Sequence, residues 1–202
     1  RCTALSAVTG GEALAVIGSN AFYYCTAFTS FRIPESVEEI GEAAFFGCEN
    51  LMSVEMGDSV KSIGVEAFSG CTALEIVALG DGVESIGPLA FDGTVLMEAY
   101  DENGLSYAGN WVIGNDGNMV SPLFREGTVG IAGYAFYNSK IGSFSLPDTI
   151  KYISDYAFYG SSELAAMDLG DGVLHIGRYA FSNCSILGRG SISLGSNLQT
   201  IG

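Results

Sequence analysis

Five cysteines are the residues of this 202-residue chain best suited to redox or metal chemistry, and they are evenly spaced. Cys2, Cys25, Cys48 and Cys71 follow one another at intervals of 23 residues, and Cys184 keeps the same register. A zinc site needs thiolates that converge on one point, which one thiol per interval does not provide. A disulfide would also strain such a column, because stacked residues have Cβ atoms about 4.5–5.5 Å apart and a disulfide needs about 3.5–4.5 Å. We therefore predict no metal, no other cofactor, and reduced, buried thiols that pack as small apolar residues.

Acidic residues recur with the same period, each in a short turn. They are Glu35, Asp58, Asp81, Asp148 and Asp171. Calcium binds to turn aspartates in some solenoids, but the glycine-rich nonapeptide of those proteins is absent here and one acid per turn supplies few ligands. Aspartate is also a common turn-forming residue, and that role alone explains the column.

His175 is the only histidine, and it is therefore the only candidate base for a Ser-His or Cys-His pair. It occupies a position that surface-type residues hold elsewhere in the pattern, so we predict that its ring is solvated. No group of polar residues converges into a catalytic constellation. The sequence therefore predicts that the chain is not an enzyme.

Composition excludes other classes of protein. The hydrophobic fraction of 48% is high enough for a packed core, which argues against a disordered acidic tail. With 23 acidic and 8 basic residues the net charge is −15, which disfavours nucleic acid and anionic membrane surfaces as partners. No apolar run approaches the roughly 20 residues that span a bilayer, so we predict no membrane insertion.

An internal repeat explains the regular spacing of these residues. The anchor Ile-Gly-x-x-Ala-Phe, with Ala132 and Ser154 in place of two of its glycines, begins at intervals of 22 or 23 residues over most of the chain, with a gap of 45 before Ile131 and of 25 before Ile201. It starts at Ile17, Ile40, Ile63, Ile86, Ile131, Ile153, Ile176 and Ile201. After each Ala-Phe, expected on a short helical turn, come a Gly or Asn, a short strand of the pattern Leu-x-x-Val-x-Leu, and an acidic turn. Such a unit cannot bury its own apolar face, whereas stacked copies share one core.

We therefore predict a leucine-rich repeat solenoid, a right-handed superhelix of short β-strands and short helical turns, with about eight coils of 22–23 residues. A single repeat domain is expected over residues 1–202. The pattern starts and stops in mid-repeat, which predicts further repeats on both sides. Residues 94–128 depart from the pattern and are expected to form a degenerate repeat with an inserted β-hairpin. We place its turn at Asp116-Gly117, between residues 110–114 and 119–121.

Residues 33–51 read Ile-Pro-Glu-Ser-Val-Glu-Glu-Ile-Gly-Glu-Ala-Ala-Phe-Phe-Gly-Cys-Glu-Asn-Leu, and this string resembles the BspA-like leucine-rich repeats of bacterial surface proteins. The resemblance covers nearly the whole chain. It implies a cell-surface or secreted location and adhesion to host or neighbouring-cell proteins, such as the matrix and plasma proteins fibronectin and fibrinogen. No residue-level binding motif is carried over from the family.

The residues themselves suggest one binding surface. Five tyrosines on three successive coils should form a single patch, and Trp111 on the irregular hairpin is a second candidate for binding. The five are Tyr134, Tyr137, Tyr156, Tyr159 and Tyr179. These rings could equally shield the edge of the core. We therefore predict a surface scaffold for protein recognition, with two alternatives: a spacer that presents another domain, or a carbohydrate-binding module.

Overall fold

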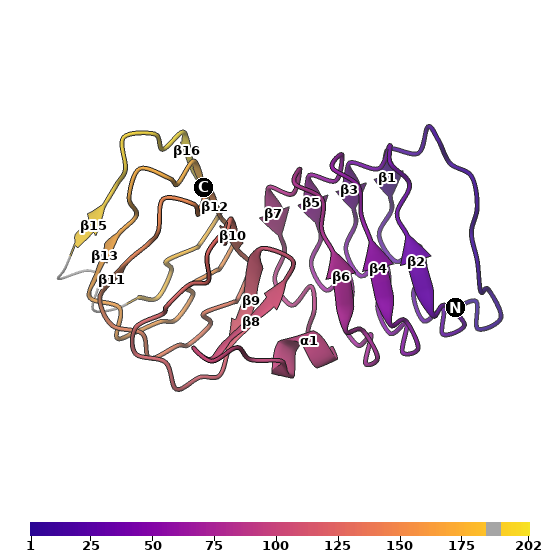
Figure 1. The fold of residues 1–202 in the computed structure, drawn as a ribbon, viewed down its shortest axis with the longest axis horizontal. Helices are drawn as coiled ribbons and strands as arrows, with labels where there is room; N and C mark the ends of the chain where they lie inside the picture. The colour runs from indigo at the N-terminus through magenta and orange to yellow at the C-terminus, as the bar shows by residue number, and fades with distance from the viewer. Residues whose placement is uncertain (185–190) are drawn as a thin grey trace. The chain divides into compact units, whose positions relative to one another are not determined.

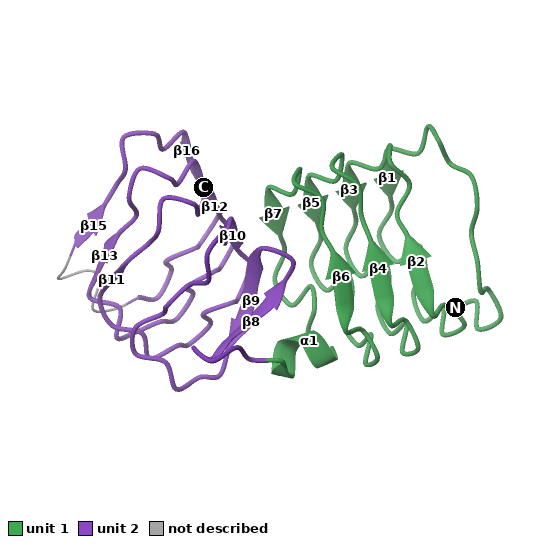
Figure 2. Cartoon of the chain, in the orientation of Figure 1, with its two compact units in different colours: residues 1–99 green, residues 100–202 purple. Residues whose placement is uncertain are grey.

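The computed structural model describes residues 1–184 and 191–202, and these residues form a β-solenoid with almost no helix (Figure 1). The chain divides into two compact units, residues 1–99 and 100–202 (Figure 2). Short parallel strands stack coil upon coil within each unit, which confirms the predicted leucine-rich repeat solenoid. That residues 1–202 make one domain stays a prediction.

Each complete coil of unit 1 contributes one strand to each of two parallel sheets. The first sheet consists of β1 (Val16–Ile17), β3 (Glu39–Ile40), β5 (Ser62–Ile63) and β7 (Ser85–Ile86). The second consists of β2 (Ser30–Arg32), β4 (Ser53–Glu55) and β6 (Ile76–Ala78). Equivalent residues of successive repeats pair directly, as Ile17, Ile40 and Ile63 do, so the sequence period sets the register. The helix α1 (Val95–Glu98) ends the unit.

Unit 2 repeats this plan and adds an antiparallel strand at one edge. Its six-stranded sheet runs in the order β16 (Thr200–Ile201), β14 (His175–Ile176), β12 (Tyr152–Ile153), β10 (Gly130–Ile131), β9 (Trp111–Asn115) and β8 (Leu105–Ala108). Its second sheet contains β11 (Phe144–Ser145), β13 (Ala166–Asp168) and β15 (Ser191–Ser193). Only the pair of β8 and β9 is antiparallel among the strands of residues 1–184 and 191–202.

The anchor phenylalanines form the centre of each core. In unit 1 the ring centroids of Phe45 and Phe68 lie 5.1 Å apart, with an angle of 9° between the ring planes. In unit 2 the rings of Phe136 and Phe158 lie 5.0 Å apart at 4°. All four side chains are fully buried. Each coil therefore adds one ring to a continuous stack, and offset-stacked rings gain energy beyond that of buried area alone.

The segment around Ala-Phe is a series of tight turns rather than the helical turn predicted from the sequence. Its amides alternate between two kinds of partner: Ala44 donates to Gly41 O within the turn at 3.3 Å, whereas Phe45 donates to Ala67 O of the next coil at 2.7 Å. Ala43 has a left-handed backbone, with φ of 51°. A left-handed residue interrupts a right-handed helix. The hydrogen bonds that a helix would make internally are therefore made between coils.

The glycine of the Ile-Gly anchor is required by the close approach of successive coils. A Cβ atom on Gly64 would lie 2.7 Å from the backbone nitrogen of Glu42. Gly18 holds the same position in the first repeat and has no atom within 4 Å of such a Cβ. The anchor glycines thus account for some of the 28 glycines of the chain.

A hairpin does occur within residues 94–128, but the predicted turn is wrong. The chain reverses at Gly109 and the following residue, so that β9 pairs with β8 on one side and with β10 on the other. Gly109 has a φ of 52°, which a two-residue hairpin turn favours. The Asp116-Gly117 segment instead closes on itself, because Asn115 Oδ1 accepts the Gly117 amide at 2.9 Å and Asp116 Oδ1 accepts the Asn118 amide at 2.9 Å.

Candidate functional site

The five tyrosines predicted to form a patch lie together on unit 2, and we call them the tyrosine surface. They occupy the turns that follow β10, β12 and β14, and are Tyr134, Tyr137, Tyr156, Tyr159 and Tyr179. Tyr137 is 50% exposed and Tyr179 is 60% exposed, while the other three are half-buried. The parallel register of the three strands brings equivalent turns side by side. The role of these tyrosines in binding stays a prediction.

The rings of the tyrosine surface contact one another in two columns. In one column, Tyr156 and Tyr179 stack with centroids 5.1 Å apart and planes 23° apart. In the other, Tyr137 and Tyr159 stack at 6.0 Å and 15°. Tyr134 joins the two columns, at 4.8 Å from Tyr137 and 5.5 Å from Tyr156. The surface is therefore one connected aromatic cluster across three coils.

Three of these tyrosines have a left-handed backbone, a conformation that bulky residues rarely adopt. The φ values of Tyr134, Tyr156 and Tyr179 are 63°, 60° and 56°. Such residues cost about 1–3 kcal/mol each unless glycine or asparagine occupies the position. The same turn in unit 1 carries four different residues, also left-handed: Asn20, Ala43, Glu66 and Leu89. The turn thus demands the conformation but not tyrosine.

Burial raises the pKa of the Tyr134 hydroxyl, and the nearby hydroxyls of Tyr156, Tyr137 and Tyr159 add to the shift. Tyr134 therefore stays protonated and can donate a hydrogen bond over the whole physiological range. On the side of β9, the loop after this strand borders the surface, since Asn115 Nδ2 donates to Ala135 O at 2.7 Å. The exposed Asp116 is the first residue after this strand.

Trp111 is not a surface residue, so the prediction that it binds a partner there is wrong. It is 2% exposed, and its ring lies 6.0 Å from that of Tyr152 with the planes 9° apart. Trp111 pairs with Gly130 on the adjacent strand, where a Cβ atom would lie 2.5 Å from the indole ring. The absence of a side chain at residue 130 makes room for the indole.

His175 is half-buried rather than solvated as predicted. Its ring stacks on that of Tyr152 at 5.6 Å and 3°, and its Nδ1 lies 2.8 Å from Thr200 Oγ1. Tyr152, His175 and Thr200 are paired residues of β12, β14 and β16. Both ring contacts of His175 therefore follow from strand register.

Four cysteines lie at one repeat position on successive coils of unit 1, as predicted, and Cys184 holds that position in unit 2. Two features differ from the prediction. All five are unpaired, but Cys2 is exposed while the other four are buried. The buried thiols also act as donors: Cys48 Sγ lies 3.2 Å from Phe22 O, and Cys71 Sγ lies 3.1 Å from Phe45 O. A hydrogen bond with the Cys48 thiol and burial raise the pKa of Cys71, and burial raises that of Cys25. The thiols of Cys71 and Cys25 are therefore protonated and poorly nucleophilic.

The turn acids form a ladder of hydrogen bonds from one coil to the next. Asp58 Oδ1 accepts the amide of Asp81 at 2.9 Å, and Asp148 Oδ1 accepts the amide of Asp171 at 3.2 Å. The Ser196 amide and hydroxyl lower the pKa of Asp171 in the same way. Nowhere in residues 1–184 or 191–202 do three potential metal ligands come together. The ladder thus gives these acids a structural role.

Unit 1 contains a second aromatic cluster, which was not predicted from the sequence. Tyr23, Tyr24 and Phe46 form it, and we call it the unit 1 cluster. Tyr23 stacks on Phe46 at 5.2 Å and 14°, and the guanidinium carbon of Arg1 lies 4.9 Å from the centroid of Tyr24. Tyr23 and Phe46 directly follow anchor phenylalanines, as Tyr137 and Tyr159 do in unit 2. That shared repeat position was the signal from which the cluster could have been found.

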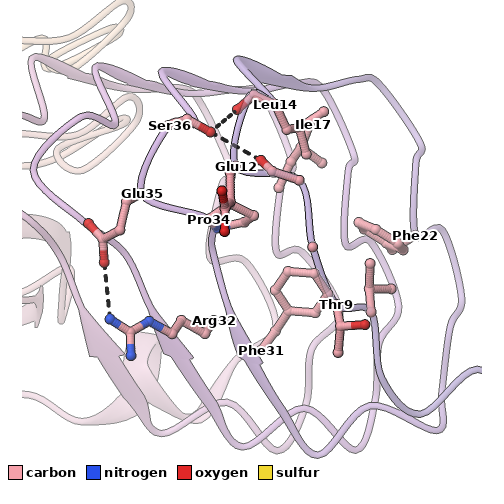
Figure 3. A pocket seen from close by; sticks show the side chains of 13 residues that line it. Thr9, Glu12, Leu14, Ile17, Phe22, Phe31, Arg32, Pro34, Glu35 and Ser36 are labelled. Atoms are coloured by element: carbon pink, nitrogen blue, oxygen red, sulfur yellow. Dashed lines mark hydrogen bonds and ion pairs between the residues drawn. The ribbon is translucent and has the colours of Figure 1, made fainter.

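A cavity of about 620 Å³ lies at the first coils of unit 1 (Figure 3). Phe22, Phe31 and Ile17 line it, and the ion pair between Arg32 and Glu35 lies at its edge, with nitrogen and oxygen 3.0 Å apart. The strand faces hold grooves of about 420 Å³ in unit 1 and 370 Å³ in unit 2. Serines line much of the unit 2 groove, whereas the unit 1 groove also contains Arg32 and Glu55.

Comparison with known proteins points to one family. The family model of the BspA type leucine rich repeat region matches residues 1–122 and 123–202. The solved leucine-rich repeat protein of T. pallidum is 26% identical, and the match covers 85% of this chain and 70% of that one with a TM-score of 0.39. A leucine-rich repeat protein from Bacteroides ovatus is 21% identical over 92% of this chain and 48% of its own length, with a TM-score of 0.47.

A leucine rich cell surface protein from Faecalibacterium prausnitzii is also 21% identical, over 92% of this chain and 77% of that one, with a TM-score of 0.37. The chain spans about half the length of the Bacteroides ovatus protein. No curated protein matches it. In the part of the chain that the structure describes, no helix is long and apolar enough to cross a membrane.

Proposed function

The chain belongs to the BspA-type leucine-rich repeat family, and we propose that it is a cell-surface adhesion scaffold that holds a protein partner on its tyrosine surface. Repeat scaffolds of this family type are generally not enzymes. Partners of the matrix and plasma protein type, and a surface or secreted location, are the finer parts of this proposal.

The observation that carries the proposal is the connected tyrosine surface. Tyrosine is enriched where proteins bind one another, because its ring supplies contact area and its hydroxyl a hydrogen bond at low entropic cost. Tyr137 and Tyr179 are at least half exposed in a chain whose other large apolar side chains mostly point inwards. Since the turn accepts other residues in unit 1, a binding role accounts for tyrosine in three successive coils of unit 2.

A carbohydrate-binding module fits this geometry less well. Sugars stack on open aromatic faces, whereas Tyr156 and Tyr159 each lie against neighbouring rings on the tyrosine surface. A pure spacer would need no repeated tyrosine on its exterior. The spacer alternative gives a different result in the binding experiment.

The test measures binding to immobilised fibronectin and fibrinogen by surface plasmon resonance. The variant replaces four tyrosines with serine: Tyr134, Tyr137, Tyr156 and Tyr159. Binding should weaken by tenfold or more, since buried interface tyrosines commonly contribute more than about 1 kcal/mol each. Tyr100, 46% exposed and outside the surface, gives the matched control Tyr100→Ser, which should bind as the unchanged protein does.

Circular dichroism must show the same strand content in the fourfold variant and the unchanged protein. If the folded variant still binds both matrix proteins with unchanged affinity, the tyrosine surface is not the binding site. If neither protein is bound even before substitution, adhesion to these partners is wrong and the spacer role is favoured.

A further inference from the structure

The unit 1 cluster holds a cation on one of its half-buried tyrosines. The Arg1 guanidinium carbon lies 4.9 Å from the ring centroid of Tyr24, within the distance at which a cation is attracted to the negative face of the ring. Tyr24 in turn contacts Tyr23 and Phe46, at centroid distances of 4.8 and 5.7 Å. A guanidinium therefore lies on an aromatic cluster built from the same turns as the tyrosine surface.

The same pairing occurs again in unit 2, away from the tyrosine surface. The guanidinium carbon of Arg125 lies 3.9 Å from the centroid of Tyr107, and the Arg125 side chain also donates to Gly109 O in the hairpin turn. The Tyr107 hydroxyl oxygen accepts the Arg125 amide at 3.2 Å. Within residues 1–184 and 191–202 a guanidinium thus lies over a tyrosine ring twice, and at one of the two places, Arg125, the side chain also donates to a carbonyl oxygen.

The tyrosine surface has no such cation within residues 1–184 and 191–202, where the only two cation–π contacts are those of Arg1 and Arg125. Tyr137 stacks on Tyr159 and is still half exposed. Arg178 precedes Tyr179, but its backbone amide is bound to Asp155 Oδ1 at 2.7 Å and its side chain lies against Gly202. The rings are therefore available to a cation from outside the chain.

Charge favours such a cation. Residues 100–202, which carry the tyrosine surface, have a net charge of −4, and Asp155 lies in one of the turns of that surface. The acidic excess attracts a basic segment from a distance, and a nearby carboxylate can accept the guanidinium donors that the ring leaves free. A neutral or acidic partner would gain neither contribution.

We infer that the tyrosine surface binds an arginine-bearing, positively charged segment of the partner protein. This inference rests on the proposed function, because it specifies the chemistry recognised at the same surface. The guanidinium lies over an exposed tyrosine ring, with Tyr137 as the main contact, and its remaining donors reach the adjoining carboxylates. Arginine is favoured over lysine because its flat, weakly hydrated group can stack and donate hydrogen bonds at once.

The test uses three labelled peptides with one Gly-Ser backbone. The first carries three arginines, the second three lysines, and the third three citrullines, which keep the shape of arginine without its charge. Fluorescence anisotropy measures their affinity for the whole chain at low and high salt. The arginine peptide should bind about tenfold more tightly than the citrulline peptide and measurably more tightly than the lysine peptide, and salt should weaken it.

Tyr137→Leu and Tyr179→Leu, which keep apolar area but remove the aromatic face, should together weaken the arginine peptide about tenfold. Tyr100→Leu is the matched control and should leave its affinity unchanged. Equal binding of the arginine and citrulline peptides would overturn the inference. So would arginine binding that survives both leucine substitutions, because net charge alone would then attract the peptide.

This experiment fails separately from the test of the proposed function. If the fourfold serine variant loses the matrix proteins but no peptide discriminates arginine, the surface binds a partner of other chemistry and only this inference is wrong. If the serine variant retains the matrix proteins while the arginine peptide still depends on Tyr137, the inference holds and the adhesion proposal is wrong.

Discussion

The two units share an interior and differ in their exteriors. The phenylalanine rings of unit 1 stack at 5.1 Å between Phe45 and Phe68, and those of unit 2 at 5.0 Å between Phe136 and Phe158. The outward columns vary: the position of Tyr134 in unit 2 is held by Ala43 and other unrelated residues in unit 1. Residues that touch the next coil are thus set by stacking, while residues that face solvent are free to acquire a function.

Charge separates the units in the same way. Residues 1–99 contain fourteen acidic and three basic residues, a net charge of −11, whereas residues 100–202 contain nine and five, a net charge of −4. Unit 1 has two of the ten tyrosines and unit 2 has eight. The more aromatic exterior therefore belongs to the less acidic unit. This contrast teaches that tyrosine is concentrated where the stack leaves the residue type undetermined.

The largest effect should come from removing a ring in the middle of either phenylalanine stack. Phe68→Ala and Phe158→Ala should each lower the free energy of unfolding by about 3–5 kcal/mol, because both side chains are fully buried between two other rings. Urea denaturation followed by circular dichroism measures the loss. Similar losses for the two variants would show that the two phenylalanine stacks stabilise their units equally. A much smaller loss in one unit would contradict this.

A smaller loss is expected from a single methyl group on an anchor glycine. Gly64→Ala in unit 1 and Gly177→Ala in unit 2 would place Cβ atoms 2.7 and 2.4 Å from backbone nitrogens of the preceding coil. Each should cost about 1–3 kcal/mol as the coils move apart. Gly18→Ala, at the same repeat position with open space around it, is the control and should melt at the temperature of the unchanged protein. If all three variants had the same melting temperature, successive coils would not be in close contact at the anchor glycines.

The repeat position of the cysteines allows a thiol and a hydroxyl to be compared as hydrogen-bond donors. Cys71 Sγ lies 3.1 Å from Phe45 O in unit 1, while Ser161 Oγ in unit 2 donates to Phe136 O at 2.6 Å. Ser161→Ala should cost about 1 kcal/mol, the usual net value of one hydrogen bond, and Cys71→Ser should be tolerated because it keeps a donor in place. Chemical denaturation measures both. A Cys71→Ser variant far less stable than Ser161→Ala would show that thiol and hydroxyl are not interchangeable there.

Those features that follow from the period of the sequence could be predicted from it. The spacing of Ile17, Ile40 and Ile63 sets strand register, and the same register places Tyr134 near Tyr156. A column of equal residues in equal coils has only one arrangement once the coils stack. The solenoid and the geometry of the tyrosine surface are therefore consequences of periodicity.

Features that depend on a single contact outside the period could not be predicted. Trp111 is buried because the residue opposite it is Gly130, and that pairing exists only once the hairpin has chosen the turn at Gly109 over the one at Asp116. Arg1 reaches Tyr24 across 23 residues through a contact that no repeat position encodes. Local turn propensity alone does not decide between competing turns, because tertiary pairing contributes to the choice.

The smallest expected effect is a loss of stability at alkaline pH. It depends on one hydroxyl group of unit 2, that of Tyr134. Burial raises the pKa of Tyr134 in the folded state above its ordinary value of about 10. As pH rises past 10, the unfolded chain releases this proton first and binds fewer protons than the folded chain, so the stability of unit 2 should fall with rising pH. Tyr134→Phe should remove that part of the decline, whereas Asn20, the residue at this position in unit 1, has no proton to lose. Thermal unfolding from pH 8 to 11 measures this decline. If the melting temperature of Tyr134→Phe falls with pH as steeply as that of the unchanged protein, the phenol is solvated and the tyrosine surface is looser than its ring distances indicate.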